Sequence, residues 1–272
     1  MTLGRNRSPA VLWLAVPAVL LVLWTFLFFP LQSVVLVIAS LALCGAGLWS
    51  CRTLMGARSA WIFLAGGIAL GWCAEQAGST MGWFFGHYSY TEVLGPRLGS
   101  VPIVIPLMWF GLCQIGFVMA SLLLWRRPVP SAVGWKSGAL VAWLAAMIVT
   151  AFDLGADPYF VYVLKAWVMQ KKDGGWFGET LRGFDGWMVV SFSIVAAYLA
   201  IARPQLVTAS GPTVRRAALV PIVIYVGMIG FQVMMTEPAA LRVVALFAMG
   251  IPSLVAWMAW SQWRDQIREG QQ

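Results

Sequence analysis

Residues 101–125 read VPIVIPLMWFGLCQIGFVMASLLLW, a stretch without a single charge that is followed directly by Arg126 and Arg127. A helix needs about 20 mostly apolar residues to cross the hydrocarbon core of a bilayer. The stretch is long enough to do so, and basic residues commonly mark the cytoplasmic boundary of a span. We therefore expect a transmembrane helix here.

Other stretches of the same kind fill most of the chain. They are 9–29, 31–49, 60–77, 138–157, 185–201, 217–235 and 239–260. Of the 272 residues 61% are hydrophobic and 10% are charged, whereas ordinary soluble domains carry roughly a quarter charged residues. The sequence predicts an all-α integral membrane protein, a polytopic bundle of about eight transmembrane helices. These form a single transmembrane domain over residues 1–272, with no room for a soluble domain.

Lysine and arginine collect in alternate connections between the expected helices. The two termini and the connections after the second, fourth and sixth stretches carry most of them, and the connection 158–184 is the exception. Because basic loops stay on the cytoplasmic side, we expect both termini in the cytoplasm and the protein in the cytoplasmic (inner) membrane. The net charge of +8 is then explained by the basic residues of the cytoplasmic loops, and no nucleic-acid partner is expected.

Two long connections, 78–100 and 158–184, lie on the expected outer side. Both are rich in glycine and aromatic residues and remain fairly apolar. Irregular backbone at membrane depth is tolerated where protein buries it or where it lines a cavity. We therefore expect these two outer-side loops to lie in the membrane interface or to fold back over a cavity.

Three carboxyl groups near the outer helix ends are the candidate catalytic residues. Glu75 lies near the end of one expected helix, and Asp153 and Asp157 lie near the end of another. The two aspartates are four residues apart and so share a helix face. Charged side chains are costly inside a bilayer and tend to face a cavity or a partner. An alternative is that all three are polar contacts at helix ends.

Several chemistries are excluded by what the sequence lacks. His87 is the only histidine, which argues against a histidine-rich di-iron site, and the four cysteines form no C-x-x-C pair. Neither a dinucleotide-binding glycine motif nor a G-x-S-x-G elbow occurs. We expect chemistry without metal or redox cofactor, carried by carboxyl and aromatic groups.

Aromatic residues are concentrated in the two outer connections and at the helix start that follows them. They include Trp83, Phe84, Tyr88, Tyr90, Trp176, Phe177 and Trp187. Two interpretations stay open at this stage. They form an aromatic belt at the membrane interface, or they line a pocket for a long apolar ligand or a cationic intermediate, which an aromatic face attracts. Gly66, Gly67 and Gly71 indicate close helix packing.

Several motifs in the middle of the chain resemble one known family. They are EQAGSTMGWFFGHYSY (75–90), LGP (94–96), VP (101–102) with Pro106 and Trp109, TAFDLGADP (150–158), WFG (176–178) and FDGW (184–187). In order and spacing they are similar to the membrane carotenoid biosynthesis proteins of bacteria and archaea, which include γ-carotene and bisanhydrobacterioruberin hydratases. The resemblance covers about residues 70–190. It departs from the family pattern at Gly183, where asparagine is expected, and at 176–180, where Tyr-Tyr-Gly-Val-Pro is expected.

The resemblance implies a cofactor-independent carotenoid 1,2-hydratase. Such an enzyme adds water to the terminal double bond of an acyclic ψ-end carotenoid and forms a tertiary alcohol. A neutral carboxylic acid would protonate the alkene, and a carboxylate would deprotonate the water that captures the cation. We expect Asp153 and Asp157 to form this pair with Glu75 opposite, the order of acid and base being open. Trp83, Tyr88, Trp176 and Trp187 would shape the pocket. The other residues expected to bind substrate are Phe84, Tyr90, Trp109 and Phe177.

Two other functions are compatible with the sequence. Paired aspartates hold Mg²⁺ and diphosphate in prenyltransferases, although the chain has only one D-x-x-x-D pair. A carotenoid or lipid carrier, or a scaffold for other carotenoid-pathway enzymes, would use the same aromatic residues without chemistry. In each case the expected partners are a long apolar ligand and the bilayer.

Overall fold

The computed structural model describes residues 9–130, 134–170, 174–206 and 211–269. The helices are α1 (Pro9–Phe28), α2 (Leu31–Met81), α3 (Val104–Trp125), α4 (Trp135–Pro158), α5 (Leu181–Ala202), α6 (Pro212–Met235) and α7 (Ala239–Glu269). The strands are β1 (Tyr88–Tyr90), β2 (Arg97–Leu98), β3 (Val101–Pro102) and β4 (Trp167–Met169). A short 3₁₀ turn, η1 (Glu92–Leu94), and a π-helical turn, η2 (Tyr159–Val163), complete the elements.

Long apolar helices dominate the described residues, so the expected all-α membrane architecture is confirmed in outline. Six of these helices are long and apolar enough to cross a bilayer, and the strands form only two-stranded sheets. The count of about eight spans stays a prediction, because it depends on how α1 and α2 are counted.

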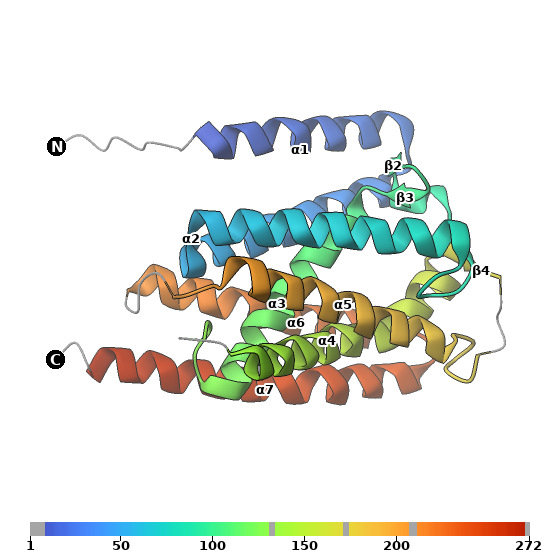
Figure 1. The fold of residues 1–272 in the computed structure, drawn as a ribbon. Helices are drawn as coiled ribbons and strands as arrows, with labels where there is room; N and C mark the ends of the chain where they lie inside the picture. The colour runs from blue at the N-terminus through green and yellow to red at the C-terminus, as the bar shows by residue number, and fades with distance from the viewer. Residues whose placement is uncertain (1–8, 131–133, 171–173, 207–210, 270–272) are drawn as a thin grey trace.

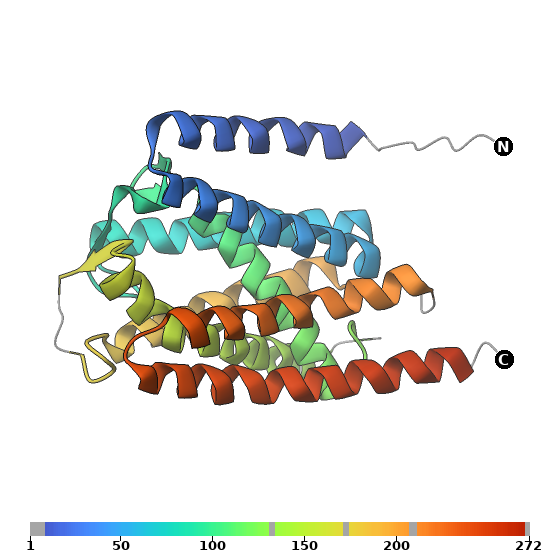
Figure 2. The ribbon, with the colours of Figure 1, turned by 180° about the vertical axis from the view of Figure 1, so that it is seen from behind.

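Helix α2 is longer than any single crossing. Its 51 residues would reach about 77 Å at 1.5 Å per residue, against a hydrocarbon core of about 30 Å. Gly56 interrupts it with φ 83° and ψ 166°, a conformation that glycine adopts without steric cost, and the ribbon reverses direction there (Figure 2). The reversal lies within the predicted connection between the stretches 31–49 and 60–77, although helix continues closer to Gly56 on both sides than predicted.

Further helix boundaries differ from the prediction. Helix α5 begins at Leu181 after Thr180 at its N-cap, rather than at 185. Helix α2 continues to Met81, and Gly82 ends it with φ 70°. The second outer connection is consequently shorter than predicted. The first keeps about its predicted length, because α3 begins at Val104 rather than at 101.

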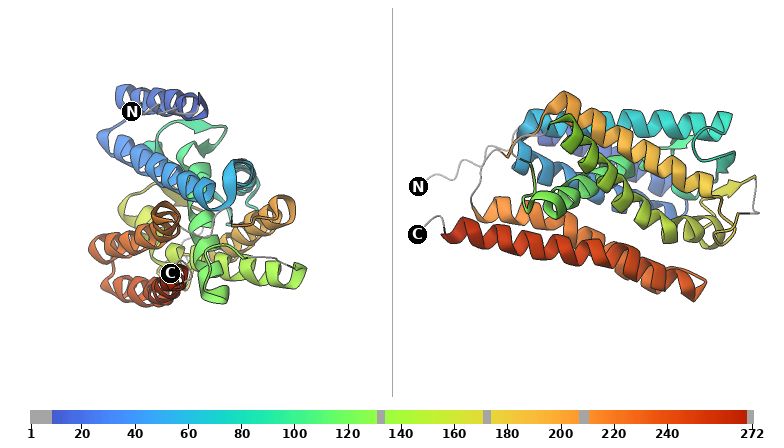
Figure 3. Two further views of the ribbon diagram at one scale, coloured as in Figure 1. Left: turned by 90° about the vertical axis from the view of Figure 1, so that its left-hand side faces the viewer. Right: turned by 60° about the horizontal axis from the view of Figure 1, so that its bottom comes forward.

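Helix α3 runs through the middle of the bundle (Figure 3). It contacts α2, α4, α5, α6 and α7, and 78% of its most apolar stretch is buried, against 28% for α6 and for α7. Large apolar side chains on α1, α6 and α7 are instead exposed, as Leu20, Val223 and Leu254 illustrate. Helices that are apolar on all faces fit a bundle whose outer surface meets lipid.

The first residues of α1 and the last of α7 lie at one end of the bundle, and the paired strands β1 and β4 lie at the other (Figure 1). This arrangement agrees with an even number of crossings. The assignment of the strand end to the outer side of the membrane stays a prediction from the basic residues.

Strand β1 pairs antiparallel with β4, which joins the two long connections. Tyr88 lies opposite Met169, and Tyr90 lies opposite Trp167. The pairing is extended at both ends, because Gln170 N donates to His87 O at 3.0 Å and Thr91 N donates to Ala166 O at 2.9 Å. The register therefore fixes how the connection after α2 sits against the connection after α4.

Candidate functional site

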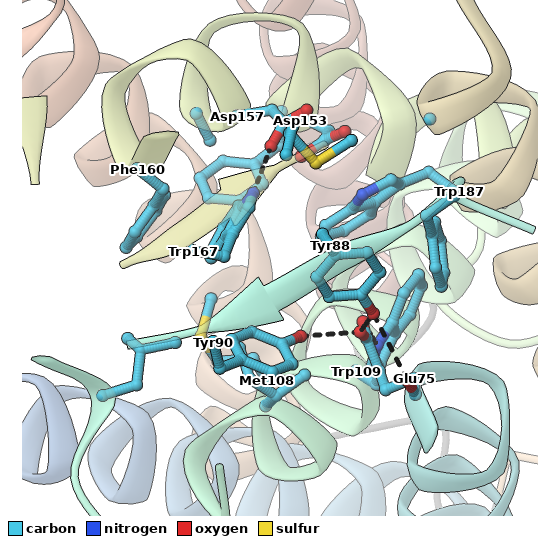
Figure 4. A pocket seen from close by; sticks show the side chains of 17 residues that line it. Glu75, Tyr88, Tyr90, Met108, Trp109, Asp153, Asp157, Phe160, Trp167 and Trp187 are labelled. Carbon is cyan, nitrogen blue, oxygen red and sulfur yellow. Dashed lines mark hydrogen bonds between the residues drawn. The ribbon is translucent and has the colours of Figure 1, made fainter. Parts of the chain in front are cut away.

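A cavity of about 50 Å³ lies beside strands β1 and β4 (Figure 4), which are at the end of the bundle away from the chain termini (Figure 1). Its lining residues are Glu75, Phe85, Tyr88, Tyr90, Leu94, Ile105, Met108, Trp109, Phe152, Asp153, Ala156, Asp157, Phe160, Trp167, Met169, Gly183 and Trp187. All three predicted catalytic carboxyl groups are among them. This volume exceeds the roughly 10–15 Å³ that a cavity needs to hold a water molecule, so the cavity can be hydrated.

Glu75 forms one wall and is surrounded by hydrogen-bond donors. Trp109 Nε1 donates to its Oε1 at 2.8 Å, Tyr90 Oη donates to its Oε2 at 2.6 Å, and Tyr88 Oη donates to the same oxygen. The residue is 5% exposed. Donors directed at both oxygens favour the ionised form of a carboxyl group.

The hydroxyls of Tyr88 and Tyr90 stay protonated in this environment. Burial, followed by the charge of Glu75, raises the pKa of each tyrosine well above its ordinary value near 10. Both hydroxyls therefore remain donors at physiological pH, and Glu75 is the acceptor they share.

Trp109 reaches Glu75 because Gly71 lies one helical turn before Glu75 on α2. A Cβ on Gly71 would lie 2.7 Å from Trp109 Cβ, and one on Gly67 would lie 3.0 Å from Phe110 Cα. The close packing expected at these two glycines is confirmed. It is not found at Gly66, where nothing lies within 4 Å of the corresponding position.

Asp153 and Asp157 form the opposite wall, side by side on α4 (Figure 4). Asp153 is 1% exposed, and its Oδ2 is buried without a hydrogen-bond partner. Asp157 Oδ1 accepts a hydrogen bond from Trp167 Nε1 at 3.1 Å. The carboxyl groups of the two walls therefore differ in their surroundings: Glu75 receives several hydrogen bonds, whereas Asp153 and Asp157 receive few.

The β1–β4 register links the two walls. Tyr90 and Trp167 are cross-strand partners whose ring centroids lie 6.0 Å apart. One donates to Glu75 and the other to Asp157. Phe160 stacks on Trp167 with centroids 5.3 Å apart, and holds the indole in place. Sequence reasoning missed Trp167, although its position in an aromatic outer connection is the same signal that identified Tyr90.

Four predicted substrate-contacting residues lie outside this cavity. Trp83 is 57% exposed and Phe177 is 37% exposed. Phe84 packs beside Phe85, and Trp176 Nε1 donates to Leu154 O at 2.9 Å. The other four residues predicted to contact substrate line the cavity: Tyr88, Tyr90, Trp109 and Trp187.

The Trp109 and Trp187 rings have centroids 4.5 Å apart and planes at 34°. Trp187 comes from α5 and Trp109 from α3, so the pair closes the cavity between two helices. Among the described residues, no group of three or more histidine, cysteine, aspartate or glutamate side chains is placed to hold a metal ion.

Glu179 is a further buried carboxyl group that sequence reasoning did not select. It is 1% exposed, and burial raises its pKa from the ordinary value near 4.5. Its carboxyl faces Asp157 and the hydroxyl of Tyr162. Its position directly after the WFG motif was the available signal.

The sequence of this helical bundle, which encloses carboxyl and indole groups, matches one protein family along most of its length. The chain belongs to the carotenoid biosynthesis protein family, whose model matches residues 13–254. A curated relative is the bisanhydrobacterioruberin hydratase of Haloarcula japonica, 28% identical over 116 residues. That alignment covers 42% of this chain and 36% of the relative. No solved structure matches the chain significantly.

Proposed function

We propose that this protein hydrates the terminal double bond of an acyclic carotenoid end. The observation that carries the proposal is the contrast between the two walls of the cavity. Glu75 receives three hydrogen bonds, whereas Asp153 has a buried oxygen without a partner. Hydration of an alkene needs one acid and one base, and different surroundings are what separate two carboxyl groups into these roles.

Asp153 acts as the acid. A carboxyl group buried without donors is most stable in its neutral form, because desolvation penalises the charge. It gives its proton to the less substituted carbon of the alkene, and the π electrons form the new C–H bond. The other carbon becomes a tertiary cation.

Glu75 acts as the base. It orients a water molecule in the cavity and takes a proton from that water as the oxygen bonds to the cation. The product is a tertiary alcohol. The catalyst is restored when Glu75 has lost a proton and Asp153 has regained one, so the net reaction consumes only water.

The aromatic pair stabilises the intermediate. A cation over the face of an indole gains roughly 2 kcal/mol or more when it is desolvated, and Trp109 and Trp187 both line the cavity. The cavity, at about 50 Å³, would have to widen to take the end of a carotenoid chain. The remainder of a long polyene would lie among lipid chains and helix surfaces outside it.

The test is expression of the full chain in a bacterium that makes lycopene, with pigment analysis by chromatography and mass spectrometry. The expected result is a more polar pigment heavier by one water. Asp153→Asn and Glu75→Gln should abolish it, with protein levels in the membrane confirmed by blotting. Unchanged pigment with both lycopene and a longer acyclic carotenoid would refute hydration and favour a carrier.

Glu92→Gln is the matched control. Glu92 lies at the same end of the bundle, is exposed, and has no place in the cavity. The same change from acid to amide should leave the product yield unaltered there. A comparable loss in this control would assign the effect to folding or insertion instead of chemistry.

A further inference from the structure

The segment 176–179 makes a tight turn that carries Glu179 back toward α4. Glu179 N donates to Trp176 O at 2.8 Å, and Trp176 N donates to Glu179 O at 3.3 Å. The two residues between them, Phe177 and Gly178, have φ 50° and 93°. Positive φ at both central positions is the geometry of a type I′ turn, which fixes where the Glu179 side chain leaves the backbone.

The Glu179 carboxyl is buried without a strong donor. Neither oxygen receives a well-formed hydrogen bond from a nitrogen or hydroxyl group, and the groups that it faces are the Asp157 carboxyl and the Tyr162 hydroxyl. Asp153 adds a third acidic group nearby. Within the described parts of the chain, the one salt bridge is the distant Arg242–Glu237 pair. Among the described residues neither Glu179 nor Asp157 forms a salt bridge, and two neighbouring buried carboxyl groups strongly disfavour being ionised together.

We propose that Glu179 shares one proton with Asp157 and, through Asp157, supplies Asp153 with the proton for each new turnover. Glu179 does not line the cavity, so it is a positioning and proton-supplying residue that acts through its neighbour. This inference rests on the proposed hydration and adds to it the route by which the acid is recharged.

The proposed proton path runs from Asp153 in the cavity through Asp157 and Glu179 to Tyr162 near the protein surface. Tyr162 is 40% exposed, and its hydroxyl packs on Gly178, where a Cβ would lie 2.2 Å from the oxygen. Asp153 loses its proton to the alkene and takes one from Asp157. The Asp157–Glu179 pair regains that proton from outside through the Tyr162 hydroxyl. Glu75 gives the proton taken from water to the cavity water as product leaves, so protons gained and lost are equal.

The first experiment measures the shared proton in the substrate-free protein and does not require activity. The infrared spectrum of purified protein in detergent should contain a carboxylic-acid C=O band at neutral pH that disappears or shifts in both Glu179→Gln and Asp157→Asn. A band unaltered by both changes would overturn the shared proton, whatever the reaction proves to be.

The second experiment measures turnover as a function of pH. Glu179→Gln keeps the size of the side chain but cannot pass a proton, so the rate should fall about tenfold or more and lose its dependence on pH, with KM unchanged. Glu179→Asp should recover part of the rate, and Glu92→Gln should match wild type. A Glu179→Gln enzyme with the wild-type rate and pH profile would overturn the proton supply, while absence of product in the wild type would refute hydration itself.

Discussion

Replacing Tyr90 by phenylalanine tests whether Glu75 is ionised. The change removes only the hydroxyl that donates to Glu75 Oε2 at 2.6 Å, and leaves the ring buried against Trp167. A hydrogen bond to a charged group contributes about 1.5–3 kcal/mol to stability, against about 0.5–1.5 kcal/mol for one between neutral groups. Because Tyr88 still donates to the same oxygen, we expect the lower part of the first range, about 1.5–2 kcal/mol.

Tyr225→Phe is the matched control for this experiment. Tyr225 is also fully buried, and its hydroxyl donates to Ile148 O at 2.5 Å, a neutral acceptor. The same chemical change should therefore cost about 0.5–1.5 kcal/mol there.

Both variants can be compared by reversible unfolding in mixed micelles, followed by the fluorescence of the 16 tryptophans. Our reasoning would be refuted if Tyr90→Phe cost no more than Tyr225→Phe, since Glu75 would then behave as a neutral acceptor. In that case the assignment of Glu75 as the base would fail with it.

Three other changes probe the surroundings of the cavity. Gly71→Ala places a methyl group 2.7 Å from Trp109 Cβ; overpacking of this kind costs about 1–3 kcal/mol and should lower both the melting temperature and turnover. Glu179→Gln should flatten the dependence of melting temperature on pH. Because the pKa of this carboxyl is raised in the folded protein, the folded state binds more protons than the unfolded state. Wild-type stability therefore falls as pH rises above about 4.5, and the variant should lose this contribution. Gly183→Asn should fold, because a Cβ at this position meets only Asp157 Oδ2, at 3.9 Å. The asparagine amide should donate a hydrogen bond to the Asp157 carboxyl and so alter turnover, while the amount of protein in the membrane stays unchanged.

Each of these has an outcome that contradicts it. Gly66→Ala is the control for Gly71, since nothing lies near that position, and it should be neutral or stabilising by up to about 1 kcal/mol. Equal effects at both glycines would contradict the packing argument. A pH profile of melting that is identical in wild type and Glu179→Gln would show that this carboxyl is not shifted. Aggregation of Gly183→Asn would show that the space is closed.

The apolar helices and the main catalytic candidates could be predicted from the sequence because their signals are local. A charge-free stretch such as 104–125 forms a membrane helix whatever surrounds it. Carboxyl groups are scarce in such a chain, so Glu75, Asp153 and Asp157 stood out by their cost in a bilayer, and all three line one cavity. A break between the stretches 31–49 and 60–77 was also expected, but no local pattern showed that helix continues on both sides to a single reversing residue, Gly56.

Only the tertiary structure decided what surrounds each carboxyl group. The β1–β4 register sets Tyr90 against Trp167, and the turn at 176–179 brings Glu179 to Asp157. These pairings join segments about 80 and 20 residues apart in the sequence. Which of several neighbouring aromatic residues reaches a carboxyl group depends on strand register and side-chain direction, and no local sequence pattern specifies these. The sequence by itself determined a membrane bundle with three candidate acids near its helix ends. The packing of distant segments buried these acids and determined which one receives hydrogen-bond donors and which has an oxygen without a partner.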